Sequence, residues 1–91
     1  MRTNVKRVLE ELGENYSMAS VDYPPTEDVY RDFHNGIDVE ILVPYYRRNL
    51  EVSVFIWKDK REIIERAFDV PLNQLKGTLE QMYRQLGLAT A

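Results

Sequence analysis

The chain has 91 residues, of which 44% are hydrophobic and 30% charged, with a formal net charge of −3, and this length fits a single domain spanning residues 1–91. The absence of cysteine excludes disulfides, cysteine-built zinc sites and thiol catalysis. No apolar run approaches the roughly 20 residues that span a bilayer, and the first residues are too charged for a signal peptide, so we expect a small acidic cytoplasmic protein without membrane contact.

The chain opens with a predicted short helix. Its apolar residues recur at the spacing of one helix face: Val5, Val8, Leu9 and Leu12. Gly13 can end this helix, which is too short to be stable without packing. The next segment, residues 15–25 (NYSMASVDYPP), favours an edge strand because it is rich in β-favouring and small residues and stops at two prolines.

Residues 26–36 (TEDVYRDFHNG) leave two interpretations open. Thr26 can cap a short helix that ends near Asn35-Gly36, or Asn35-Gly36 can form a two-residue hairpin turn. The turn would set two pairs of residues opposite each other: Arg31 with Glu40, and Phe33 with Asp38.

Residues 37–45 and 50–57 form the clearest predicted element, a β-hairpin in which both strands alternate apolar and polar residues. A two-residue turn at Arg48-Asn49 would pair Val43 with Val54 and Ile41 with Ile56. One face of the hairpin then consists of core residues: Val39, Ile41, Val43, Tyr45, Val52, Val54 and Ile56.

Residues 62–70 (EIIERAFDV) fit a third strand or a helix with a capping box from Asp59 and Glu62. We favour the strand, since two strands alone are rarely stable and Pro71 separates this segment from the last helix. That last helix has a long apolar stripe: Leu72, Leu75, Leu79, Met82, Tyr83 and Leu86. Gly87 and Leu88 suit a Schellman ending.

These elements predict an α+β fold, with a three- or four-stranded antiparallel sheet and an N-terminal and a C-terminal helix packed on one face. The order resembles that of double-stranded-RNA-binding domains, but their lysine-rich run at the start of the second helix is replaced here by "VPLNQLKGTL", which excludes the family. The order of the elements and the acidic charge also resemble those of the small chaperones of bacterial type III secretion. This resemblance implies an antiparallel sheet flanked by helices in a protein that usually forms dimers.

The segment "PYYRRN" raises the question of nucleic-acid binding. Arginine can bond phosphate and tyrosine can stack on bases, which makes Tyr45, Tyr46, Arg47 and Arg48 candidate contacts. Duplex binding needs a basic surface, however, and residues 1–40 hold four Lys/Arg against nine Asp/Glu. We therefore expect the segment to be mainly the bend of the hairpin.

The acidic region before and within the hairpin offers oxygen ligands and one imidazole: Glu27, Asp28, Asp32, His34, Asp38 and Glu40. In the two-residue-turn interpretation, Asp32 and His34 lie on one face and Asp38 and Glu40 on the other, so we expect no metal site. A restriction-type nuclease would need Glu-x-Lys, whereas Glu51 is followed by Val-Ser. With no glycine-rich phosphate loop either, we expect no enzyme, no catalytic residue and no cofactor.

The second face of the hairpin carries too many apolar side chains for a solvated surface. Leu42 would lie opposite Phe55, with Trp57 and Tyr46 on the same side. Either residues 15–34 cover this face, or it is an interface anchored by Trp57 and Tyr46.

We expect this interface to bind another protein, as an inhibitor, adaptor or chaperone does, or a second copy of the chain as a homodimer. A phage or mobile-element origin would suit such a short inhibitory protein.

Overall fold

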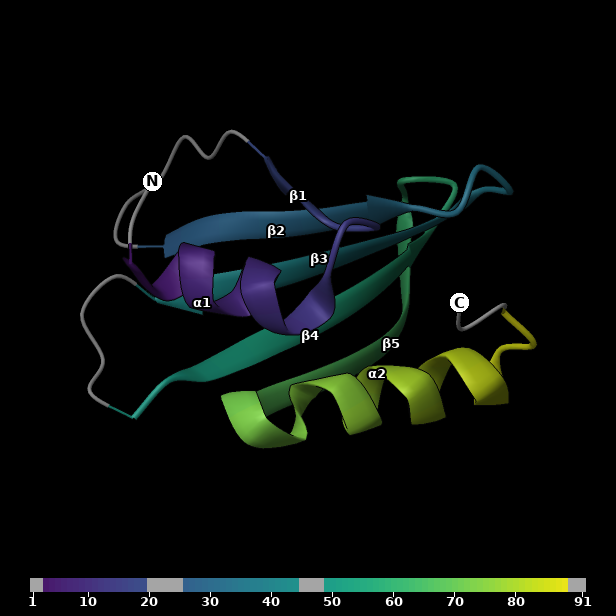
Figure 1. Cartoon of the computed structure of the whole chain (residues 1–91). Coiled ribbons are helices and arrows are strands. Elements are labelled where there is room, and N and C mark those ends of the chain that lie inside the picture. The colour runs from purple at the N-terminus through teal and green to yellow at the C-terminus, as the bar shows by residue number, and fades with distance from the viewer. Residues whose placement is uncertain (1–2, 20–25, 45–48, 89–91) are drawn as a thin grey trace.

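The computed structural model describes residues 3–19, 26–44 and 49–88, and it contains a helix at each end of the described chain with five strands between them (Figure 1). The elements are α1 (Thr3–Leu12), β1 (Ser17–Ala19), β2 (Thr26–Asp32), β3 (Ile37–Pro44), β4 (Glu51–Lys58), β5 (Glu62–Pro71) and α2 (Leu72–Gln85). The strands form one antiparallel sheet in the order β1-β2-β3-β4-β5. The α+β class is confirmed, but the sheet has five strands rather than three or four, because β1 and β2 both add to it.

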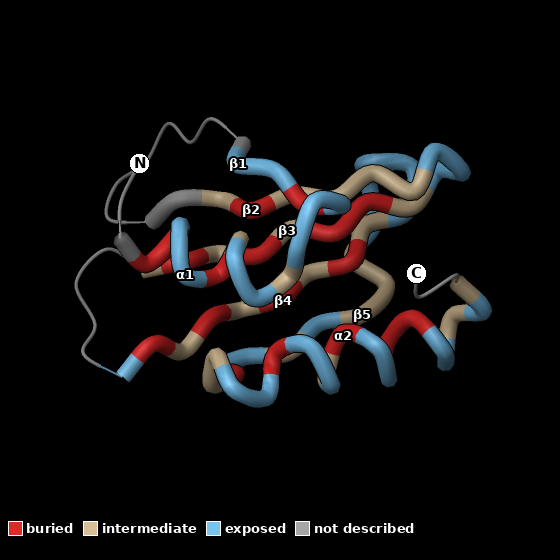
Figure 2. Tube along the Cα trace, viewed as in Figure 1, coloured by how far each residue is buried: buried red, intermediate tan, exposed pale blue. Residues whose placement is uncertain are grey.

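Both helices pack on the same face of the sheet (Figure 1). α1 contacts β2 and β3, while α2 contacts β4 and β5. Figure 2 shows the buried positions running along the central strands and recurring along α2. The predicted core face is confirmed for its described members, which are all at most 1% exposed: Val39, Ile41, Val43, Val52, Val54 and Ile56. Tyr45 lies outside the described residues.

The register of β3 against β4 differs from the predicted one by two residues. Ile41 pairs with Val54 and Val39 with Ile56, instead of Val43 with Val54 and Ile41 with Ile56. Residues 45–48 of the connection lie outside the described residues. Side chains alternate with a period of two along a strand, so a shift of two keeps every residue on its predicted face. The core was therefore predicted correctly from an incorrect pairing.

The register of β2 against β3 differs by one residue, and this shift changes faces. Residues 26–32 are a strand, and the loop after it is closed by a hydrogen bond from the Phe33 N–H to the Ile37 carbonyl (3.0 Å), not by a two-residue turn. Arg31 therefore lies opposite Val39, and Tyr30 lies opposite Glu40. The predicted pairs Arg31–Glu40 and Phe33–Asp38 are wrong.

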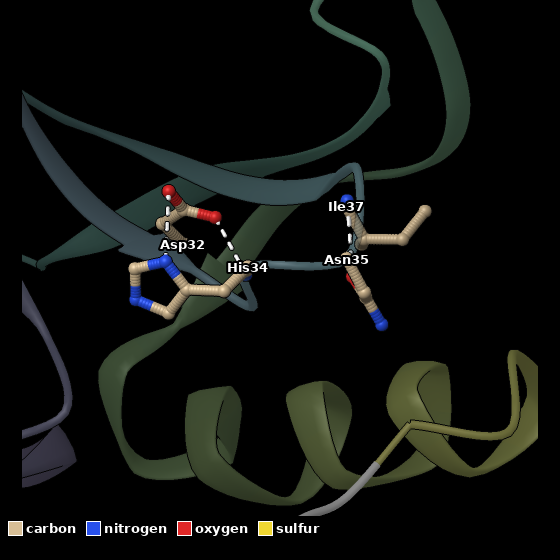
Figure 3. A network of polar contacts seen from close by, with 4 residues as sticks. All are labelled: Asp32, His34, Asn35 and Ile37. Atoms are coloured by element: carbon tan, nitrogen blue, oxygen red, sulfur yellow. Dashed lines mark hydrogen bonds and ion pairs between the residues drawn. The ribbon is translucent and has the colours of Figure 1, made fainter.

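Side-chain hydrogen bonds within the loop stabilise a connection that is one residue longer than the predicted two-residue turn (Figure 3). The Asp32 carboxylate accepts the backbone N–H of His34 at 2.7 Å, and the Asn35 side chain accepts that of Ile37 at 3.1 Å. Such side-chain caps stabilise a backbone turn and satisfy its free N–H groups. His34 itself takes a positive φ of 60°.

The shift brings Arg31 to the helix side of the sheet, where aromatic rings surround its guanidinium group. The group lies 4.2 Å from the ring centre of Phe33, 5.4 Å from that of Tyr16 and 5.7 Å from that of Tyr83. Cation–π contacts of this kind stabilise a charge at the rim of a core. The Tyr16 and Tyr83 hydroxyls hydrogen-bond to each other, and burial raises the pKa of Tyr83 well above its usual range.

Gly36 joins the β2–β3 loop to the turn after β4. It has φ +89°, its carbonyl accepts the Asp59 N–H at 2.7 Å, and a Cβ added there would lie 2.8 Å from Asp59 Oδ1. We expect Gly36→Ala to lower the free energy of unfolding by about 1–2 kcal/mol, because alanine is strained at this φ and displaces Asp59.

Gly77→Ala is the matched control for this substitution. Gly77 lies within α2 with no atom within 4 Å of an added Cβ, so alanine there is expected to raise the free energy of unfolding by about 1 kcal/mol. Urea unfolding measures the change in the free energy of unfolding for both variants. Changes in the same direction would contradict this role of Gly36.

The C-terminal part of the chain follows the prediction closely. Residues 62–71 form β5, and four residues of the predicted stripe of α2 are buried: Leu75, Leu79, Met82 and Tyr83. The Leu88 N–H donates to the Tyr83 carbonyl at 2.8 Å while Gly87 takes φ 71°, which is the predicted Schellman ending. Neither described helix has the length and apolar character required to cross a membrane.

Candidate functional site

The sheet face opposite the two helices, called the open face below, is not covered by any described element (Figure 1). β1 and β2 extend the sheet sideways instead of folding over this face. The alternative that residues 15–34 cover the face is therefore wrong for the described part of that segment, and residues 20–25 lie outside the described residues.

The register assigns the side chains of the open face. They belong to the positions that alternate with the core residues and include Asp28, Tyr30, Asp32, Asp38, Glu40, Leu42, Ser53, Phe55, Trp57, Ile63, Arg66 and Phe68. Of the predicted interface residues, Leu42, Phe55 and Trp57 lie on this face, while Tyr46 is outside the described residues. The predicted pairing of Leu42 with Phe55 is wrong, since Leu42 lies opposite Ser53 and Phe55 opposite Glu40.

Phe68 adds an aromatic side chain that the sequence analysis did not place here. Its ring meets that of Phe55 edge to face, with 5.6 Å between the ring centres, and the residue is 60% exposed. A register shift between the pairs of Val52 and Val54 separates Phe68 from the core residue Val70. Asp69 takes a positive φ of 54° at this shift. Aspartate tolerates that conformation, so its presence between two apolar residues was the available signal for a bulge.

Carboxylates concentrate on the β2–β3 part of the open face. Asp28 lies diagonally next to Glu40 across the strand pair, and burial, followed by a hydrogen bond to Glu40 and the negative charge of Glu40, raises the pKa of Asp28 to about 7. Oδ1 of Asp28 is buried without a hydrogen-bond partner. Trp57 Nε1 donates to Glu40 Oε1 across a long distance of 3.4 Å. Glu40 therefore interacts with both Asp28 and Trp57, and its contact with Trp57 is the long one.

A shallow hollow of about 320 Å³ lies beside these carboxylates. Its walls are formed by side chains of three strands and the turn after β4: Tyr30, Asp38, Glu40, Trp57 and Lys60. The pKa of Tyr30 is raised to about 12, first by burial and then by a hydrogen bond to Asp38 and the charge of that residue. Asp38 itself is only 5% exposed.

The acidic residues meet in a different way from the predicted one. Asp32 lies directly opposite Asp38 on the same face, because three residues (34–36) rather than two separate the hydrogen-bonded residues Phe33 and Ile37, which shifts the register by one. The pKa of Asp32 is lowered, chiefly by the hydrogen bond from the His34 N–H. His34 is a surface residue whose Nδ1 lies 3.5 Å from Asp32 Oδ2 (Figure 3). Within the described ranges, no three His, Asp or Glu residues are arranged to hold a metal ion.

The candidate nucleic-acid contacts Tyr45, Tyr46, Arg47 and Arg48 lie outside the described residues. A scan against protein-family models, a search of curated proteins and a search of solved structures each find no match to this chain. The open face and its chemistry are therefore the features of the described structure that point to a function.

Proposed function

We propose that the protein binds another protein through the open face and acts by occupying a surface of that partner, as an inhibitor, adaptor or chaperone does. The observation that supports this most directly is Phe68, which is 60% exposed and packs edge to face on Phe55. The half-buried Trp57 follows Phe55 by two residues on the same face of β4. Adjacent apolar side chains on an uncovered face are typical of interaction sites, and tryptophan is a frequent anchor of such sites.

The edges of the sheet are less suited to binding a partner than the open face. β1 has three residues, and β5 is interrupted by two register shifts and carries Glu62, Glu65 and Arg66. Short, bulged and charged edges prevent the addition of a further strand. This supports binding by side chains on the face rather than by backbone pairing.

Site-specific photo-crosslinking tests the proposal. A photoreactive phenylalanine analogue replaces Phe68 on the open face or, as the control, Lys76, which is exposed on α2 on the opposite side of the sheet. In cells that naturally produce the protein, we expect a discrete protein adduct from position 68 and none from position 76. Equal adducts from both positions, or none from position 68, would contradict a binding role of this face.

Trp57→Ala in the crosslinking variant tests whether Trp57 anchors the contact. Trp57 is half-buried, so we expect the variant to stay folded by circular dichroism while the adduct yield falls roughly tenfold or more, as for a hot spot worth about 2 kcal/mol. A folded variant with an unchanged yield would remove Trp57 from the interface.

A second copy of the chain is the alternative partner, since a twofold pair would place the same face on both subunits. The mass of the adduct distinguishes the two cases. Light scattering coupled to size exclusion, at several concentrations and salt levels, provides an independent check, because an apolar interface would be insensitive to salt.

Nucleic-acid binding through Tyr45, Tyr46, Arg47 and Arg48 stays a prediction. The carboxylates of Asp28, Asp38 and Glu40 make the open face itself unsuited to phosphate.

A further inference from the structure

The hollow on the open face combines two aromatic rings with two carboxylates. Asp38 and Glu40 come from β3, in the middle, while Tyr30 and Trp57 come from the strands on either side. The register places Tyr30 opposite Glu40 and Trp57 opposite Asp38, so each carboxylate has an aromatic neighbour. Aromatic rings and carboxylates both attract cations, and a planar guanidinium group can use both at once.

The hollow also has capacity for additional hydrogen-bond donors. The bond from Trp57 Nε1 to Glu40 Oε1 is long, at 3.4 Å, and Glu40 lines the hollow, so its carboxylate can accept further donors there. An arginine side chain supplies five N–H donors in a fixed fork that matches carboxylate oxygens. A bound cation would also reduce the repulsion between Asp28 and Glu40.

We infer that the partner of the open face inserts an arginine side chain into the hollow between Tyr30 and Trp57, where its guanidinium group binds Glu40 and Asp38. This inference rests on the proposed protein-binding function and adds the chemistry of the contact. The neighbouring Phe55 and Phe68 then contact apolar residues that flank the arginine.

Lys60 and Glu40 allow a test in which two substitutions are expected to change the affinity for arginine in opposite directions. Its side chain lines the hollow and is exposed, so its ammonium group competes with the inserted arginine for the same carboxylates. Removing the charge of Lys60 strengthens binding, whereas removing that of Glu40 weakens it. Glu40→Gln keeps the shape of the side chain and the oxygen that accepts the Trp57 N–H.

The experiment uses N-acetyl-L-arginine N-methylamide as the probe and its citrulline counterpart, which has nearly the same shape but no charge, as the control ligand. Binding is followed by nuclear magnetic resonance through the indole N–H of Trp57, the single tryptophan of the chain. We expect the arginine probe to shift this resonance with a Kd in about the millimolar range, as ligand size allows, and citrulline to bind roughly tenfold more weakly.

The variants complete the test. Glu40→Gln is expected to weaken the arginine probe about tenfold, and Lys60→Gln to strengthen it about two- to fivefold, since an exposed charge has the smaller effect. Glu51→Gln is the matched control, because Glu51 pairs with Pro71 at the far end of β4 and its loss is expected to leave the Kd unchanged. The dispersion of the amide resonances verifies that each variant is folded.

Equal binding of arginine and citrulline, an unchanged Kd in folded Glu40→Gln, or no shift of the Trp57 resonance up to roughly 50 mM probe would overturn the inference. None of these three results contradicts the proposed protein-binding function if position 68 still crosslinks to a protein. Conversely, a missing adduct alongside specific arginine binding would refute the protein-binding function while the cation site remains.

Discussion

Ile41→Ala is expected to lower the free energy of unfolding by about 2–5 kcal/mol, whereas Leu42→Ala, one residue further along β3, is expected to lower it by about 1 kcal/mol or less. Ile41 is fully buried between the sheet and the helices, so its truncation leaves a cavity in the core. Leu42 is half-buried on the open face, where water fills the space that its side chain leaves.

The pair is a matched comparison because both substitutions remove an aliphatic side chain from the same strand. Urea unfolding followed by circular dichroism measures both free energies. A domain of this size has a stability of about 5–15 kcal/mol, so Ile41→Ala leaves only a small margin in the least stable case. If Leu42→Ala cost as much as Ile41→Ala in a protein that light scattering shows to be a monomer, another part of the chain would cover the open face, and the proposed interface would be refuted.

The sorting of residues between the two faces could be predicted from the sequence, because it depends only on the alternation of side chains along each strand. Val39, Ile41 and Val54 stay on the core face in any register that is shifted from the observed one by an even number of residues. Pairing depends on the length and hydrogen bonding of the loops, which the apolar pattern does not encode. The even error in the β3–β4 hairpin was therefore harmless, while the odd error in the β2–β3 hairpin moved Arg31 and Tyr30 to unexpected faces.

The candidate site was predictable only in its apolar part for the same reason. Phe55 and Trp57 follow from alternation within β4. The hollow needs Tyr30 beside Glu40, which depends on the three-residue loop, and Phe68 needs the bulge at Asp69. Both features involve residues with a positive φ, His34 and Gly36 in the loop and Asp69 at the bulge, and hydrophobic periodicity does not report this local property.

Asp28→Asn is expected to raise the free energy of unfolding by about 1–2 kcal/mol near pH 8 and to leave it almost unchanged near pH 4. In the folded protein, burial and Glu40 raise the pKa of Asp28 from 3.8 to about 7. The folded state therefore keeps the proton of Asp28 between about pH 4 and 7, where the unfolded state has already released it, and stability falls as the pH rises through this range. Asp28 is only half-buried, so solvent screening makes the effect smaller than the full pKa shift would imply.

Urea unfolding of the wild type and the variant at both pH values measures this difference. The amide introduced by Asp28→Asn can still donate a hydrogen bond to Glu40, as the protonated Asp28 does, which is why we expect the two proteins to agree at low pH. Asp69→Asn is the control for the loss of one carboxylate, because Asp69 is exposed on β5 and asparagine also accepts its positive φ. Its difference from the wild type is expected to stay within about 0.5 kcal/mol at both pH values.

A difference between Asp28→Asn and the wild type that does not depend on pH, or a variant that is less stable near pH 8, would show that Asp28 is not under electrostatic strain in the folded protein. The expected result would mean that the open face carries a carboxylate at the expense of stability. Selection for stability alone would not favour such a residue, whereas a cationic partner would benefit from it, because ionised Asp28 and Glu40 together attract a guanidinium group. Asp28→Asn is therefore also expected to bind the arginine probe more weakly than the wild type near pH 8, so that one substitution increases stability and decreases binding.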